Sequence, residues 1–158
     1  MTQLRYDEPE DFPPDSWDGS ESVTPDQLKV VVVDDDQLMR RLLQRALTGL
    51  GFTQITYAEN GAEGLVAAER VSPAIIISDY HMPQMHGLEF VEAVRAIEAL
   101  DQAVIIMLSA ADDPVVIEGA RDRGADTFMV KPFDRADLKQ LIDTLYHRFN
   151  AARIQWPE

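Results

Sequence analysis

Between residues 28 and 149, five short apolar runs alternate with five longer amphipathic stretches, and this alternation limits the possible folds. Runs such as VVVV, AIIIS and VIIML are typical of strands covered on both faces of a parallel sheet. We expect strands at 28–34, 53–58, 74–79, 103–109 and 127–130, and helices near 37–49, 61–71, 87–100, 113–123 and 135–149. Five strand–helix units in succession predict an α/β fold, a doubly wound five-stranded parallel sheet with five helices on its two faces.

The two ends of the chain depart from this pattern. Residues 1–27 hold four of the nine prolines and eight acidic residues against a single base, Arg5, which gives them a net charge of −7. Such a composition is typical of a segment that cannot build a packed core. We therefore interpret 1–27 as an acidic, disordered N-terminal tail, 28–149 as the folded domain and 150–158 as a short C-terminal tail.

Composition excludes several classes of function. The net charge of the whole chain is −14 and no basic stripe interrupts it, which argues against direct contact with nucleic acid. The chain has no cysteine, so disulfides and thiolate metal sites are excluded. No apolar run reaches the roughly 18 residues of a membrane span, and the acidic N-terminus lacks the apolar core of a secretory signal. We expect a cytoplasmic protein that binds neither a membrane nor nucleic acid.

Polar side chains gather where the predicted strands end. The first strand runs into Asp34, Asp35 and Asp36, the third into Asp79, the fourth into Ser109 and the fifth into Lys131. In a parallel sheet the carboxyl ends of the strands share one edge, where ligands bind. Carboxylates brought together there repel one another unless a cation such as Mg²⁺ lies among them. One aspartate could then accept a phosphoryl group whose oxygens contact the lysine and the serine.

Four segments, VVVVDDDQLMRR, IIISDYHMPQMHG, VIIMLSA and RGADTFMVKPF, together resemble the receiver (response-regulator) domain of two-component signalling, of the chemotaxis-regulator type. The resemblance covers about residues 28–149, with the segments in the order and spacing of the family. It implies a flavodoxin-like sheet with strand order 2-1-3-4-5. It also implies Mg²⁺ as the cofactor and a cis peptide bond between Lys131 and Pro132.

The resemblance gives the acidic residues separate roles. Asp79 matches the phosphoacceptor, because the M-P-x-M-x-G loop of the family follows it. Asp34 and Asp35 match the acidic metal-binding pair, with Asp35 as the direct ligand of Mg²⁺ and Asp34 acting through water. Asp79 and the backbone carbonyl of His81 complete the implied metal site. His86 departs from the family, which often carries aspartate at that position.

The remaining matches concern the response to phosphorylation. Ser109 matches the hydroxyl that hydrogen-bonds the phosphoryl group, and Lys131 matches the lysine that pairs with it. Phe128 matches the switch aromatic that turns inward, and the small Ala110 leaves room for that movement. Simpler interpretations stay open: Ser109 as a locally satisfied hydroxyl, Lys131 as a solvated lysine and Phe128 as a core residue. Asp36 is expected to cap the first helix and not to bind metal.

The function predicted from these residues is a phosphorylation-dependent signalling switch. A histidine kinase or a histidine phosphotransfer protein would donate the phosphoryl group to Asp79 with Mg²⁺. The face made by helix four, strand five and helix five would then change and control the binding of an output protein. The domain would catalyse its own phosphorylation and dephosphorylation without being a turnover enzyme.

Several alternatives stay open. The chain could be a phosphorelay intermediate, the N-terminal receiver fragment of a longer regulator, or a pseudo-receiver that is not phosphorylated. An aspartate-nucleophile phosphohydrolase is disfavoured, because DDDQL at residues 34–38 does not supply the D-x-D-x-[TV] motif of those enzymes.

The first helix, QLMRRLLQRALTGL, has a wide apolar stripe beside three arginines. One interpretation is core packing with a solvated basic edge, and the other is a docking surface for the helical bundle of a partner. His147, on the last helix, is expected at the surface.

Overall fold

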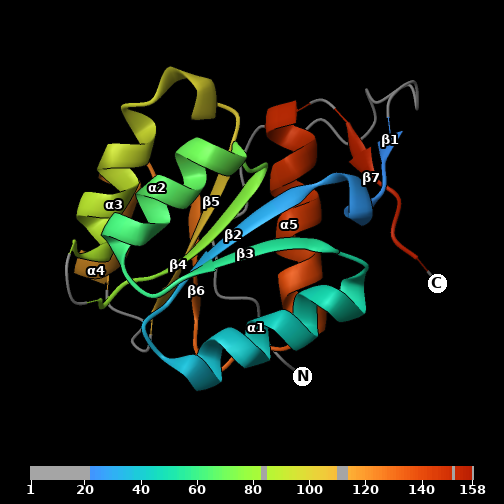
Figure 1. The fold of residues 1–158 in the computed structure, drawn as a ribbon, viewed down its shortest axis with the longest axis horizontal. Helices are drawn as coiled ribbons and strands as arrows, with labels where there is room; N and C mark the ends of the chain where they lie inside the picture. The colour runs from blue at the N-terminus through green and yellow to red at the C-terminus, as the bar shows by residue number, and fades with distance from the viewer. Residues whose placement is uncertain (1–21, 83–84, 110–113, 151, 158) are drawn as a thin grey trace.

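A five-stranded parallel sheet lies between two layers of helices in the computed structural model, which describes residues 22–82, 85–109, 114–150 and 152–157 (Figure 1). The strands of this sheet are β2 (Lys29–Val33), β3 (Gln54–Ala58), β4 (Ile75–Asp79), β5 (Val104–Ser109) and β6 (Thr127–Val130). The helices are α1 (Gln37–Leu50), α2 (Gly61–Val71), α3 (Gly87–Arg95), α4 (Pro114–Asp122) and α5 (Arg135–Asn150). Two 3-10 turns, η1 (Pro25–Gln27) and η2 (Glu98–Leu100), and two short strands, β1 (Ser22–Val23) and β7 (Arg153–Ile154), complete the described elements.

The order of the sheet is β3-β2-β4-β5-β6, with every neighbouring pair parallel. This order confirms the predicted flavodoxin-like arrangement, since β2 to β6 are the five strands expected from the sequence. The prediction of one continuous helix at 87–100 is wrong for residues 96–100. The helix ends at Arg95, because Ile97 leaves the helical conformation and packs against the core, and η2 follows as a separate turn.

Two hydrophobic cores form, one on each face of the sheet. Along β2 the side chains alternate, so that Val30 and Val32 join one core while Val31 and Val33 join the other. The first core is closed by α1 and α5, and the second by α2, α3 and α4 (Figure 1). The valine run is therefore buried on both sides, which fixes the chain that leads into the following aspartates.

The segments at the two ends of the described chain pair with each other. Strands β1 and β7 lie parallel, with Ser22 opposite Arg153 and Val23 opposite Ile154. The sequence predicts that residues 22–27 and 152–157 belong to the two tails, but the structure includes them in the folded unit, with Ile154 buried. Strands of two residues are too short to show a period-2 pattern, which is why the sequence did not indicate them. The rest of the predicted N-terminal tail, 1–21, lies outside the described residues.

Trp156 fastens the C-terminal segment to the domain. Its ring meets the ring of Phe52 edge to face, with 5.8 Å between the centroids, and its indole N–H donates to the Asp143 carboxylate at 3.1 Å. The Lys139 ammonium lies 5.6 Å from the centroid of the same ring. These contacts join the chain end to α5 and to the turn before β3.

Two further predictions from the sequence concern His147 and membrane-spanning helices. His147, which was expected at the surface, is buried with 8% of its area exposed, because the last turn of α5 faces the rest of the domain. In the described part of the chain, every helix is too short or too polar to cross a membrane.

We predict that Trp156→Ala lowers the free energy of unfolding by about 2 kcal/mol, because the variant loses the ring contact and the indole hydrogen bond. Urea unfolding followed by circular dichroism measures this change. Gln155→Ala, an exposed neighbour in the same segment, is the control and should change the free energy little. Equal stability of both variants would show that the chain end does not contribute to the fold.

Candidate functional site

The carboxyl ends of four strands meet at one edge of the sheet, because all neighbouring strands are parallel. Asp34 directly follows β2, and its backbone N–H donates to the Ala58 carbonyl at 3.0 Å, which extends the ladder with β3 by one residue. Asp79 and Ser109 are the last residues of β4 and β5. Lys131 follows β6, and its backbone N–H donates to the Ser109 carbonyl at 2.8 Å. The four residues predicted from the strand ends are therefore brought to the same edge.

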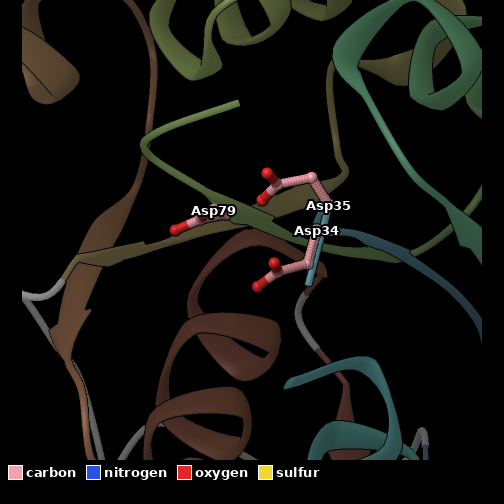
Figure 2. Close-up of side chains that lie close together, drawn as sticks. All are labelled: Asp34, Asp35 and Asp79. Atoms are coloured by element: carbon pink, nitrogen blue, oxygen red, sulfur yellow. The ribbon is translucent and has the colours of Figure 1, made fainter. Parts of the chain in front are cut away.

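Three carboxylates gather at the ends of β2 and β4, as Figure 2 shows for Asp34, Asp35 and Asp79. One oxygen from each lies within 4.8 Å of the others. Asp34 is fully buried, Asp79 is 7% exposed and Asp35 is exposed. The cluster therefore combines two buried carboxylates with one that is exposed to solvent. Hard oxygen ligands that solvent can reach suit a divalent cation.

The hydrogen bonds of Asp34 support the same interpretation. Its Oδ1 accepts the backbone N–H of Asp36 at 2.9 Å. Its Oδ2 is buried and accepts no hydrogen bond within the described residues. A buried carboxylate oxygen that accepts no hydrogen bond is costly. The Lys131 ammonium, 3.6 Å away, lies beyond hydrogen-bonding distance, so this oxygen can still contact a metal ion or water. The residues therefore fit a metal ion such as Mg²⁺.

Lys131 provides the positive charge that the structure shows inside this cluster. Its Nζ donates to Oδ1 of Asp79 at 2.9 Å and lies 3.6 Å from Oδ2 of Asp34. Burial lowers the pKa of Lys131, but the hydrogen bond and the charge of Asp79, together with the charge of Asp34, outweigh it and hold the pKa above its usual value. The lysine is thus a fixed cation at neutral pH, and the alternative of a solvated lysine does not describe it.

The pKa of Asp34 is also above its usual value, which for a carboxyl disfavours the charged form. Burial is the largest influence and raises the pKa of its carboxyl, with further upward contributions from the charges of Asp79 and Asp35. The Asp36 N–H and the Lys131 charge lower the pKa but do not cancel the increase. Burial therefore outweighs the hydrogen bond and the ion pair that stabilise the charged form of Asp34.

Asp36 has the capping role expected from the sequence. It is the N-cap of α1, and its carboxylate accepts the backbone N–H of Leu38 at 2.9 Å. In the first turn of the same helix, the guanidinium of Arg40 donates to the Asp34 carbonyl at 2.7 Å. The start of α1 thus holds the backbone of the acidic run in place, while Asp36 itself stays outside the cluster.

The predicted switch residues occupy the neighbouring strands. Ser109 is buried at the end of β5, and Phe128 on β6 is buried in the core shared with α3 and α4. Phe128 is therefore a core residue in this structure. Ala110 lies outside the described residues. The side chain of His81 is exposed, and the peptide bond between Lys131 and Pro132 is cis, as the resemblance implies.

The structure also gives His86 a role that sequence reasoning missed. It is the N-cap of α3, where its Nδ1 accepts the Leu88 N–H at 3.3 Å. Its ring meets the ring of Tyr80 edge to face at 4.7 Å between centroids, and His81 meets Tyr80 in the same way at 4.7 Å. An imidazole nitrogen can replace the carboxylate that the family often places there, and its position directly before Gly87 was the available signal.

The fold and site define a class of protein, and comparison with known sequences agrees with it. Residues 30–143 match the family model of the response regulator receiver domain. The chain therefore belongs to the receiver domain family of response regulators, the switches of two-component signalling.

Its similarity is to the chemotaxis type. The chain is 36% identical over 121 residues to a probable chemotaxis protein CheY of Rhizobium etli, covering 77% of this chain and 94% of that protein. It is 34% identical over 124 residues to the chemotaxis protein CheY of Pseudomonas aeruginosa, covering 78% of this chain and 99% of that protein.

Solved structures give the same result. Vibrio cholerae CheY4 superposes with a TM-score of 0.71 at 32% identity, covering 75% of this chain and 98% of that chain. The CheX–CheY–BeF3–Mg complex of Borrelia burgdorferi has a TM-score of 0.70 at 28% identity, covering 75% of this chain and 89% of that chain.

We predict that Mg²⁺ raises the thermal unfolding temperature of the protein after chelator treatment, because an ion that binds the folded cluster stabilises it by mass action. Asp35→Ala should remove most of this rise. Asp36→Ala should lower the unfolding temperature itself through loss of the helix cap, yet keep the Mg²⁺ response. Differential scanning calorimetry with and without Mg²⁺ measures both effects, and an unchanged response in Asp35→Ala would contradict the metal site.

Proposed function

We propose that this receiver domain accepts a phosphoryl group on Asp79 from a histidine kinase or a histidine phosphotransfer protein. The observation that carries the proposal is the ion pair at 2.9 Å between Lys131 and Asp79, set inside a cluster of three carboxylates. A carboxylate that is paired with a partly buried lysine and still 7% exposed can reach a phosphorus atom presented from solvent.

In the proposed transfer, an oxygen of the Asp79 carboxylate attacks the phosphorus of a phosphohistidine. The new O–P bond forms as the P–N bond breaks, and the electron pair of that bond leaves with the imidazole of the donor. The product is an acyl phosphate on Asp79. Mg²⁺, held by Asp34, Asp35, Asp79 and the backbone carbonyl of His81, would supply positive charge for the phosphoryl oxygens.

The side chains around Asp79 suit the charge that develops during this transfer. Lys131 keeps its proton, because its pKa lies above the usual value, so its ammonium can move from the Asp79 oxygen to a phosphoryl oxygen. Ser109, at the end of the adjacent strand, is the proposed hydroxyl donor to another phosphoryl oxygen. Water can later attack the same phosphorus, which would return Asp79 to its free form.

The proposed output is a change in the face formed by α4, β6 and α5. Movement of Ser109 toward the phosphoryl group, with Ala110, would let Phe128 change its position on β6. Phosphorylation need favour the new arrangement by only a few kcal/mol, since about 1.4 kcal/mol corresponds to a tenfold change in population. The altered face would then bind an output protein with a different affinity.

We predict that incubation with acetyl phosphate and Mg²⁺ adds one phosphoryl group to the wild-type protein and none to Asp79→Asn. Intact-mass spectrometry detects the addition. Asp36→Ala is the matched control, since it removes a neighbouring carboxylate outside the cluster and should still be phosphorylated. Absence of any added mass in the wild type, with Mg²⁺ shown to bind, would identify a pseudo-receiver instead.

We also predict that Lys131→Met slows phosphorylation by on the order of 10²-fold, because the transferred group loses a positioned cation. The time course of the mass change gives the rate. Lys29→Met, which removes an exposed lysine at the opposite end of β2, should leave the rate unchanged. Equal rates in the two variants would contradict the role of Lys131.

A further inference from the structure

Helix α1 exposes an apolar and basic stripe that the described fold leaves uncovered. Leu38 is 64% exposed and Leu42 is 44% exposed, and both lie on the same side of the helix as the exposed Arg41 and Arg45. The spacing of these four residues, i, i+3, i+4 and i+7, defines a single face. We call this set (Leu38, Arg41, Leu42 and Arg45) the α1 face. The opposite side of the helix packs into the core.

The charge of this face is unusual for the chain. The whole sequence has a net charge of −14, yet α1 carries three arginines and no acidic residue. The other described α-helices, α2 to α5, each contain at least one carboxylate. In the described residues no ion pair joins Arg41 or Arg45 to a carboxylate. Arg135, at the start of α5, lies against Gly49 and extends the basic surface toward the end of α1.

The N-terminal part of the chain enters the fold close to this helix. Gly51, the C-cap of α1, is packed against Pro25, and the side-chain amide of Gln54 donates to the Asp26 carbonyl at 2.8 Å. Residues 1–21 therefore join the described structure at Ser22, three residues before Pro25, which lies beside the C-terminal end of α1. Fully extended, 21 residues could reach about 70 Å, whereas α1 with its 14 residues is about 21 Å long. Length does not prevent this segment from covering the whole helix.

The composition of residues 1–21 complements the α1 face. The segment holds seven carboxylates and one arginine, so its net charge is −6, and it also contains the apolar residues Leu4, Tyr6, Phe12 and Trp17. Opposite charges attract, and the aromatic side chains can cover the two exposed leucines. We propose that residues 1–21 of this chain bind the α1 face of the same molecule.

The covalent connection favours such binding even when the individual contacts are weak. A segment joined directly to the domain has an effective concentration in the millimolar range, so an intrinsically weak interaction can still be populated. The rest of the chain, residues 22–158, has a net charge of −8, so on average it attracts the acidic segment less than the α1 face does. If the proposed function holds, a bound segment would restrict the approach of phosphodonor and output proteins to α1, immediately beside the acidic cluster.

The absence of cysteine permits a direct test on the 158-residue chain. A nitroxide spin label on Ser16→Cys broadens amide signals that come near it. In isotope-labelled protein we expect loss of amide peak intensity along α1, and none along α3 in the helix layer on the other face of the sheet. Added salt should restore the α1 signals, because the Debye length falls below about 10 Å above 0.1 M.

Paired variants separate the α1 face from general electrostatics. Arg41→Glu with Arg45→Glu should abolish the loss of intensity along α1. Arg121→Glu with Arg123→Glu, the same change in charge on exposed residues at the end of α4, should preserve it. If both pairs behave alike, the proposal is contradicted.

Two further outcomes would overturn the proposal. The same signal loss in a mixture, where the spin label and the isotopes are on different molecules, would assign the face to a second copy. Unchanged α1 signals in the wild-type background would leave the face to a separate partner protein. The experiment needs neither Mg²⁺ nor a phosphodonor, so its failure is distinct from a failure of phosphorylation.

Discussion

The contact between the Lys131 ammonium and the Asp79 carboxylate is the interaction on which the site depends. It spans 2.9 Å and joins β6 to β4 across the intervening strand β5. Without it, two largely buried carboxylates, Asp34 and Asp79, would face each other with no described cation between them. One ammonium does not balance three carboxylates, so the arrangement favours the binding of a second cation.

The fold makes this arrangement possible by burying the strands on both faces. The alternating valines of β2 anchor the chain in two separate cores, which leaves the following aspartates little freedom to move apart. Asp36 and Arg40 then secure the backbone from the start of α1, one through the helix cap and the other through the Asp34 carbonyl. The energetic cost of a buried carboxylate is thus offset by packing and hydrogen bonds outside the reacting group.

Most of the fold and the central site could be predicted from the sequence, because both follow from local pattern. The apolar runs indicated the strands. Their parallel order predicted that Asp34, Asp79, Ser109 and Lys131 lie on one edge of the sheet. Features that depend on contacts between distant segments were not predictable. The pairing of β1 with β7 involves strands of two residues, and the burial of His147 results from packing of the last turn of α5. The proposed movements of Ser109 and Phe128 depend on phosphorylation of Asp79, and local sequence pattern does not encode a difference between two states.

In the proposed function, Asp79 accepts the phosphoryl group, and the Lys131 ammonium moves from the Asp79 carboxylate to an oxygen of that group. A crystal structure of the full chain with Mg²⁺ and beryllium trifluoride, which stands in for the phosphoryl group, tests it most directly. We expect beryllium bound to a carboxylate oxygen of Asp79, Lys131 Nζ in contact with a fluoride, and Mg²⁺ among the three aspartates. Beryllium trifluoride bound elsewhere, with the Lys131–Asp79 contact intact at saturating ligand, would contradict it.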